Sequence, residues 1–298
     1  MTIADEERLA GQAIEAGAFE RAITLLRPLA ERQSEYALLT LGWIYETGAT
    51  GAVDPVAARA LYEQAAAQGS AAGYLRLGWL LQNNGENGPA RSAFEAGARL
   101  DNDECRSALA RLADNDVERV AGRALEDKQY AKAVELLLPL AERNSEYALI
   151  SLGWIFDTGS IGLPDKAAAQ SYYERAVNLG SATGHLELGR LLLELGQETR
   201  ARALFAAGAE MGNIPCMARL GDMMVVGSGG DIDAVAGYGW LEKAAAHDHI
   251  FAKRTLLGRD ARNARSLLSK LSVNLKILLL SFKGGREVSK NPYSDKIR

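Results

Sequence analysis

The sequence of 298 residues is poor in aromatic residues, proline and cysteine. Aromatic residues make up 7% of it and there are 7 prolines, which disfavours a β-sandwich, while Ala and Leu supply much of the 48% hydrophobic content, which favours helix. The only cysteines, Cys105 and Cys216, stand at equivalent places in an internal duplication and are badly placed to bond to each other. We therefore expect a reduced, cytoplasmic protein.

The chain also lacks the patterns of a targeting segment and of a catalytic site. Residues 1–10 carry three acidic side chains and no apolar run, so we do not expect a secretory signal there. No nucleophile and base or pair of carboxylates stand at a catalytic spacing, and the glycine-rich run 227–230 lacks the Lys-Ser/Thr of a phosphate loop. The three histidines, His185, His247 and His249, nominate no metal site. We expect a protein that is not an enzyme and holds no cofactor.

Charge is divided unevenly along the chain, although the formal net charge is only −4. From Lys253 to the end there are twelve Lys and Arg against three Asp and Glu, which leaves 22 against 35 in residues 1–252. The protein therefore has an acidic body and a basic tail. An acidic body argues against nucleic acid as a partner.

An internal duplication organises the body at an offset of 111 residues. Residues 28–48 and 139–159 are identical at 16 of 21 positions, and the correspondence runs without a gap from about 9/120 to 105/216. We expect a first module at 1–113, a second at 114–258 and a separate segment at 259–298. In the first copy, Asp114-Asn115-Asp116 stands where a second helix corresponding to 230–246 is missing, and we expect a bend there.

A shorter period lies inside each copy, marked by a small residue that follows Leu. Its spacings are 36, 32, 43, 36 and 32 residues, at Gly42, Gly78, Ala110, Gly153, Gly189 and Gly221. Periods in this range are typical of two-helix solenoid repeats, because each helical hairpin has an apolar face that only a neighbouring hairpin covers. The sequence therefore predicts an all-α fold of stacked antiparallel helix pairs.

One repeat shows how such a pair begins and ends. Apolar residues at helical spacing predict a first helix over 36–45. Asp54 is placed to cap a second helix and Pro55 to occupy its first turn. That helix runs to about Gln68, and Gly69 is expected to end it in the left-handed conformation.

These residues resemble a known family. Tyr36-Ala-Leu-Leu-Thr-Leu-Gly-Trp and the later Ala65-Ala-Ala-Gln-Gly are similar to the Sel-one-like repeat, a relative of the tetratricopeptide repeat with a longer loop between its helices. The pattern recurs over 147–180 and 217–246, while the units near Ala71 and Ala182 look closer to the shorter tetratricopeptide form. The resemblance implies a right-handed α-solenoid with a concave groove lined by the first helix of each pair. It further implies a cytoplasmic scaffold or adaptor that binds a protein or peptide partner in that groove.

Three tryptophans at one repeat position are the strongest candidates for partner contact. Each follows Leu-Gly on a first helix, and Trp dominates the energetics of many interfaces. Together with polar residues of the first helices of the pairs, the candidate partner-binding residues are Trp43, Trp79, Trp154, Thr40, Glu46, Arg76, Asp157 and Arg190. The alternative is that each Trp packs on the adjacent helix. For Glu46 and Asp157, a solvated face is a better explanation than a role in the groove.

The tail contains a basic amphipathic helix. Apolar residues follow a 3,4 spacing between Ala261 and Phe282, and the basic residues lie mainly away from them, at Arg262, Arg265, Lys270 and Lys276. This helix either covers the last repeat or contacts anionic lipid or an acidic partner. The second possibility makes the chain a membrane-peripheral assembly or regulatory factor, as bacterial relatives that serve envelope or polysaccharide systems suggest. The lysines interrupt a stretch too short to span a bilayer.

Overall fold

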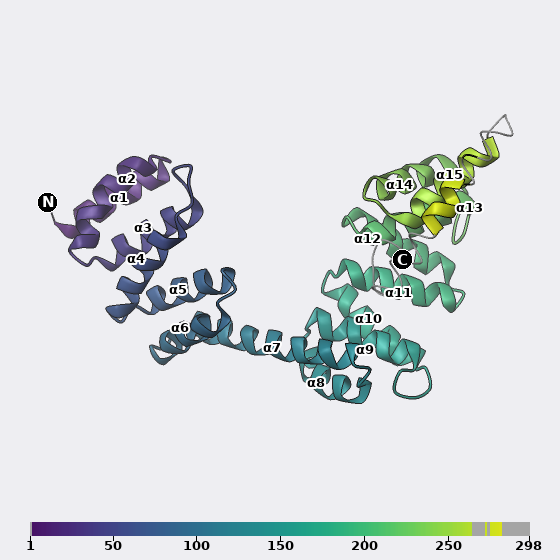
Figure 1. Ribbon diagram of the computed structural model, residues 1–298, viewed down its shortest axis with the longest axis horizontal. Helices are drawn as coiled ribbons and strands as arrows, with labels where there is room; N and C mark the ends of the chain where they lie inside the picture. Colours follow the sequence, from purple (N-terminus) through teal and green to yellow (C-terminus); the bar gives the residue numbers. More distant parts are fainter. Residues whose placement is uncertain (1, 264–271, 273–274, 282–298) are drawn as a thin grey trace. The chain divides into compact units, whose positions relative to one another are not determined.

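The structure is a computed structural model that describes residues 2–263, 272 and 275–281. Over these residues it is all-helical and contains no strand, as the sequence predicted (Figure 1). The chain divides into two compact units, Met1–Val117 and Glu118–Arg298. Each unit is a stack of helices that follow one another along the chain (Figure 1).

Odd-numbered helices are the first members of the pairs, called A helices, and even-numbered helices are the second members, called B helices. The first unit holds α1 (Ile3–Glu15), α2 (Phe19–Glu31), α3 (Glu35–Thr47), α4 (Pro55–Ala67), α5 (Ala71–Asn83) and α6 (Asn87–Arg99). The boundary between the units falls inside α7 (Asp103–Glu126). The second unit continues with α8 (Tyr130–Glu142), α9 (Glu146–Thr158), α10 (Lys166–Asn178), α11 (Ala182–Glu194), α12 (Glu198–Glu210), α13 (Ile214–Val226), α14 (Ala234–Ala246) and α15 (Ile250–Asn263).

Helix pairs stack as a helical solenoid requires. From α1 to α6, and again from α8 to α15, each helix packs on the next one along the chain. Successive A helices also touch, as α3 does with α5 and α9 with α11. The predicted all-α solenoid of consecutive helix pairs is therefore confirmed.

Serine residues fix the starts of four A helices, α3, α5, α9 and α11. Each of these serines accepts a hydrogen bond from the amide three residues later, at 2.8–3.1 Å, in Ser34, Ser70, Ser145 and Ser181. The same hydroxyls donate to a glutamate on the preceding A helix, namely Glu7, Glu35, Glu118 and Glu146. One side chain thus caps its own helix and ties it to the helix before it.

The B helix of the first full repeat begins and ends at the predicted residues. Asp54 accepts a hydrogen bond from the amide of Ala57 at 2.9 Å, and Pro55 stands in the first turn. Gly69 has a φ of +83°, in the left-handed region that Gly adopts without steric cost. The local signals for this helix are confirmed.

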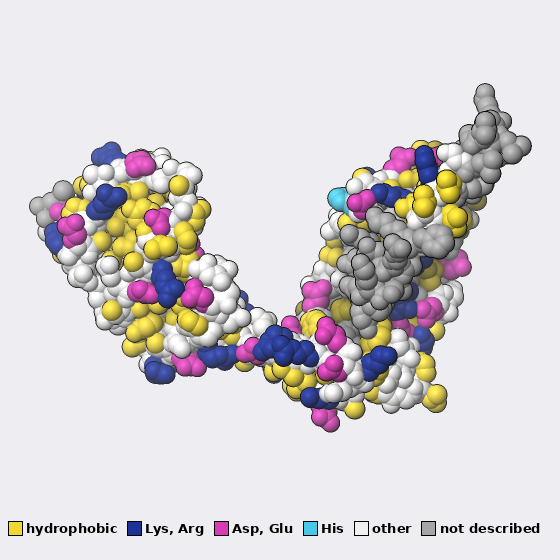
Figure 2. Space-filling view, in the orientation of Figure 1, with side chains coloured by type: hydrophobic (Ala, Val, Ile, Leu, Met, Phe, Trp, Pro, Cys, Tyr) yellow, Lys and Arg dark blue, Asp and Glu magenta, His cyan; other side chains and the backbone are white. Residues whose placement is uncertain are grey.

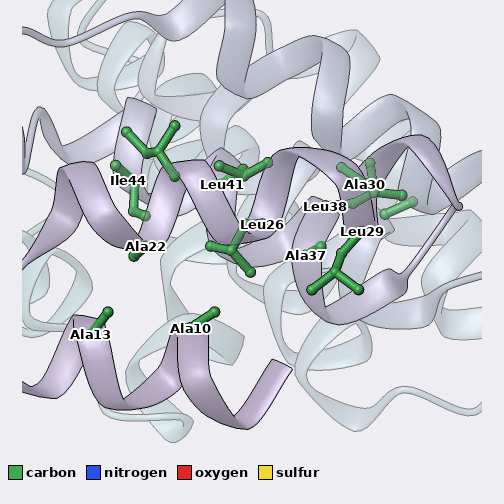
Figure 3. Packing of buried hydrophobic residues seen from close by; sticks show 12 residues of the cluster. Ala10, Ala13, Ala22, Leu26, Leu29, Ala30, Ala37, Leu38, Leu41 and Ile44 are labelled. Carbon is green, nitrogen blue, oxygen red and sulfur yellow. The ribbon is translucent and has the colours of Figure 1, made fainter. Parts of the chain in front are cut away.

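Small residues let the helices approach closely. In the first unit, Ala10 and Ala13 of α1 point toward Ala22 and Leu26 of α2, and all four are buried (Figure 3). Gly42 on α3 lies directly against the ring of Tyr62 on α4, where an added Cβ would overlap the ring. Gly on the A helix and a large side chain on the B helix therefore fit together as a pair.

Helix α7 continues through the residues where the sequence predicted a bend. Asp114, Asn115 and Asp116 all lie inside its 24 residues. Residues 103–121 contain no Gly or Pro. The polar side chains of this run extend away from the helix, so they leave its backbone hydrogen bonds intact. The first copy thus lacks the counterpart of the helix at 230–246, and the long helix α7 runs through this place instead.

Candidate functional site

The candidate tryptophans Trp43, Trp79 and Trp154 lie on A helices and are all half-buried. Trp43 packs on Phe19 of α2 with ring centroids 6.1 Å apart, and Trp154 packs in the same way on Tyr130 of α8 at 5.9 Å. One face of each indole is therefore fixed by a B helix. The rest of each side chain remains partly accessible at the surface of its unit.

Trp79 is held differently. Its ring meets the edge of Phe94 on α6 at 5.1 Å, and the guanidinium of Arg111 on α7 lies over it at 4.7 Å. Arg111 occupies the same repeat position on the next A helix, since it follows Leu109 and Ala110. Neighbouring members of this row therefore touch within the first unit.

Trp154 also lines a pocket of about 270 Å³ in the second unit. Its walls come from three A helices, α7, α9 and α11, through Gly122, Leu125, Glu126, Tyr147, Ile150, Ser151, Trp154 and Glu187. The lining is mostly apolar, with carboxylates at two places. A cavity of about 150 Å³ holds a benzene ring, so this pocket has room for a large apolar side chain.

Asp157, one turn beyond Trp154, is buried in an ion network. Its side chain is 2% exposed and accepts hydrogen bonds from Lys166 Nζ at 2.5 Å and from the guanidinium of Arg190. Burial alone would raise the pKa of Asp157, but the two cations outweigh it and hold the pKa below its ordinary value. The expectation of a solvated face is wrong for Asp157, because Lys166 and Arg190 supply the partners that a buried carboxylate requires.

Arg190 is the centre of this network. It also pairs with Glu187 at 3.0 Å and with Glu194, which in turn accepts from Lys166 at 2.9 Å. Burial opposes the charged form of Arg190, yet the carboxylates of Asp157 and Glu187 raise its pKa. Glu187 thereby links the network to the wall of the pocket.

The remaining candidates of the first copy lie on α3 and α5. Thr40 is half-buried, and Glu46 accepts a hydrogen bond from the hydroxyl of Tyr62 at 2.7 Å. Arg76 is exposed. Figure 2 shows hydrophobic side chains gathered on the visible face of this unit, with charged side chains of both signs scattered among them.

Comparison with known families supplies the deciding observation. The Sel1 repeat model matches three segments of the chain, residues 36–70, 146–181 and 214–249. The chain contains three Sel1 repeats. Its first two Sel1 repeats carry Trp43 and Trp154, and the third has Asp222 at the same position.

Solved structures of Sel1 repeat proteins have the same fold. The Sel1 repeat protein from Oxalobacter formigenes is 24% identical, with a TM-score of 0.63 over 85% of this chain and 86% of that one. The protein c5321, a protective antigen of uropathogenic Escherichia coli strains that displays an SLR fold, is 20% identical, with a TM-score of 0.58 over 93% of this chain and 64% of that one. No curated protein matches the chain in sequence. At these identities the similarity establishes the fold.

Sel1 repeats generally serve protein–protein interaction and are generally non-catalytic. Across residues 2–263, 272 and 275–281, no group of three or more His, Cys, Asp or Glu could hold a metal ion. The same residues include no helix long and apolar enough to cross a membrane.

Several lining residues were not singled out from the sequence of these Sel1 repeats. Tyr147, Ile150 and Leu125 complete the pocket beside Trp154. The useful signal was Gly122, a glycine in mid-helix, because an added Cβ would lie 3.0 Å from the hydroxyl oxygen of Tyr147. A helical glycine with a large neighbour marks a close approach of two A helices.

The basic tail is described only in part. Arg262 belongs to α15, whereas Arg265 and Lys270 lie outside the described residues. Lys276 lies in the helical segment 275–281 and is exposed. Leu275, Leu278 and Leu279 of the same segment are 58%, 52% and 60% exposed.

Proposed function

We propose that the chain is a non-enzymatic scaffold or adaptor that binds a peptide or protein partner on the A-helix faces of its units. The carrying observation is the pocket of about 270 Å³ beside Trp154. Its walls are apolar and aromatic, and a half-buried Trp forms one of them. Sites of this composition anchor single large side chains of a partner.

The arrangement of the repeats supports this function. Both α9 and α11 are tied to the preceding A helix by a Ser–Glu hydrogen bond, so their lining residues belong to helices with a fixed spacing. Trp154 is braced by Tyr130 behind it. A rigid, preformed wall reduces the entropy lost on binding.

Selection from a displayed library of random peptides tests the proposal. The full chain is the target, and Trp154→Ala and Ser151→Arg are the variants, the second filling the pocket without removing the indole. Trp240→Ala is the matched control, since Trp240 is half-buried on the B helix α14. We expect a class of peptides that binds the wild type and the control but loses at least about tenfold in affinity to both pocket variants.

Circular dichroism spectra must show wild-type helicity for each variant. The proposal fails if no peptide is selected, or if Ser151→Arg and Trp154→Ala bind every selected peptide as the wild type does. It also fails if Trp240→Ala causes the same loss as the pocket variants. In that case binding depends on general stability and not on the pocket.

A second candidate function is peripheral membrane contact through the tail, and the exposed leucines of 275–281 favour it. Leu275, Leu278 and Leu279 share one side of a helix turn beside the exposed Lys276. We expect sedimentation with vesicles rich in anionic phospholipid, lost when the three leucines are replaced by Ser. Equal sedimentation of the variant and the wild type would exclude this function.

A further inference from the structure

The two copies of the duplication build matching walls on their A-helix faces. At the offset of 111, the pocket residues Gly122, Tyr147 and Trp154 correspond to Gly11, Tyr36 and Trp43. An added Cβ on Gly11 would lie 3.2 Å from the hydroxyl oxygen of Tyr36, as against 3.0 Å for Gly122 and Tyr147. The close approach of A helices is therefore the same in both copies.

The other wall positions also correspond. Leu125 and Ile150 of the second copy match Ile14 and Leu39 of the first, and Ser151 matches Thr40. Both tryptophans pack on an aromatic ring at the start of the preceding B helix, at 6.1 and 5.9 Å. The apolar walls beside Trp43 and Trp154 are thus shared between the copies, whereas Trp79 of the first copy corresponds to Arg190 of the second.

The two copies differ in the charges at matched positions near these walls. Glu187 on the pocket wall corresponds to Arg76, and Asp222 on α13 corresponds to Arg111 on α7. Both arginines are exposed, and neither forms an ion pair with any residue that the structure describes. Glu187 is 6% exposed, and Asp222 is half-buried.

Arg76 and Glu187 act on the same tyrosine position in their respective copies. Burial raises the pKa of Tyr62 and of its counterpart Tyr173. Beside that effect, Glu46 raises the pKa of Tyr62 while Arg76 acts to lower it, and Glu187 raises the pKa of Tyr173 while Arg190 acts to lower it. At the matched position, Arg76 and Glu187 thus act on the buried tyrosine with opposite charges.

The second copy keeps an excess of negative charge even though it contains cations. Lys166 and Arg190 are both held by carboxylates of the ion network. At the matched positions of the second copy, the three cations Lys166, Arg190 and Arg219 stand against the five carboxylates Glu126, Asp157, Glu187, Glu194 and Asp222. In the first copy, Arg76 and Arg111 balance the carboxylates Glu15 and Glu46.

We propose that the two copies bind peptide segments of opposite charge. The Trp154 pocket takes a large apolar side chain flanked by lysine or arginine, and the face around Trp43 and Trp79 takes one flanked by aspartate or glutamate. The apolar walls supply affinity in both copies, and the reversed charges decide which segment each copy accepts. This inference rests on the proposed binding function and adds the chemistry of its ligands.

The same displayed library tests this inference, with the binding face of each copy disrupted in turn by a Trp substitution. Peptides that Trp154→Ala no longer retains should carry Lys or Arg next to an apolar residue, and peptides lost with Trp43→Ala should carry Asp or Glu. Arg76→Glu with Arg111→Asp gives the first copy the charges of the second. We expect this variant to lose at least about tenfold in affinity for the acidic peptides.

Two further variants complete the test. Glu126→Arg, at an exposed position of the pocket rim, should weaken the basic peptides. Arg99→Glu is the matched control for charge reversal, because Arg99 lies on the B helix α6 with its side chain 77% exposed. It should leave the affinities of both classes unchanged.

The outcomes separate this inference from the proposed function. If peptides depend on Trp43 or Trp154 but show no charge bias, or if Arg76→Glu with Arg111→Asp leaves their affinities unchanged, opposite selectivity is wrong and partner binding stands. If neither Trp substitution changes which peptides are retained, both proposals are wrong.

Discussion

His249 is a buried histidine that caps a helix of the last repeat. It stands at the start of the A helix α15, where other A helices have Ser, Thr or Asn, and it is fully buried. Its Nδ1 accepts a hydrogen bond from the amide of Ala252 at 3.3 Å. A ring nitrogen accepts only when unprotonated, so the cap requires neutral imidazole.

Acid should therefore destabilise the second unit through His249. Burial lowers the pKa of His249 from 6.5 to about 4, with Arg219 acting in the same direction. Between these values the unfolded chain binds a proton that the folded chain does not, so the free energy of unfolding falls as pH decreases from about 6.5 to 4 and is flat for this group above 6.5. We expect a loss of about 2 kcal/mol between pH 7 and pH 5.

Chemical denaturation of the wild type and of His249→Asn measures this effect. Asn213 caps α13 by the same kind of bond, so the variant keeps a capping acceptor that does not titrate. Burial raises the pKa of Asp222, an effect of opposite sign that is common to both proteins. A wild-type loss between pH 7 and pH 5 no larger than that of His249→Asn would contradict the account.

Asp157 is the second residue with a large expected effect. Asp157→Asn removes the negative charge that holds Lys166 and Arg190, both of which keep carboxylate partners in Glu194 and Glu187. We expect the free energy of unfolding to fall by about 3 kcal/mol, as for other broken buried pairs. The matched control is Glu46→Gln, since Glu46 at the equivalent position accepts from Tyr62 and holds no cation in the described structure. Urea denaturation showing equal losses for the two variants would contradict the role assigned to the ion network.

At the scale of elements, the Ser–Glu bonds hold successive A helices together. Ser181→Ala removes the cap of α11 and its bond to Glu146 on α9 at once. We expect a loss of about 1–2 kcal/mol in the free energy of unfolding. Ser171→Ala, at an exposed position inside α10, is the matched control and should change it by less than about 0.5 kcal/mol. Equal losses for the two variants in thermal or urea denaturation would show that the Ser181 hydrogen bonds contribute nothing to the free energy of unfolding.

The elements themselves were largely predictable from local sequence. Asp54, Pro55 and Gly69 act within one or two turns, so their roles follow from residue type alone. The continuity of α7 was not predictable, because Asp114-Asn115-Asp116 has the composition of a turn as well as of an exposed helix segment. Local preference there is weak, and the neighbouring helical residues decide the outcome.

At the scale of the whole molecule, the sequence predicted the repeat architecture but not the site. The periodic Leu-Gly positions indicate how the two helices of each pair pack together. The pocket, in contrast, is formed by residues between Gly122 and Glu187 on three different A helices. The burial of Asp157 also depends on partners on α10 and α11. Such features arise from stacking, which no single repeat contains.

The central claim is that the A-helix face, and not the B-helix face, contacts the partner. The most direct measurement places a photo-crosslinking amino acid at Ser151 in the pocket or at Ser171 on the B helix α10, irradiates the intact protein in its source cells and identifies the adducts by mass spectrometry. The account predicts a discrete protein adduct from position 151 that competes with the selected peptides, and none from 171. The same adducts from both positions, or an adduct from 171 alone, would contradict it.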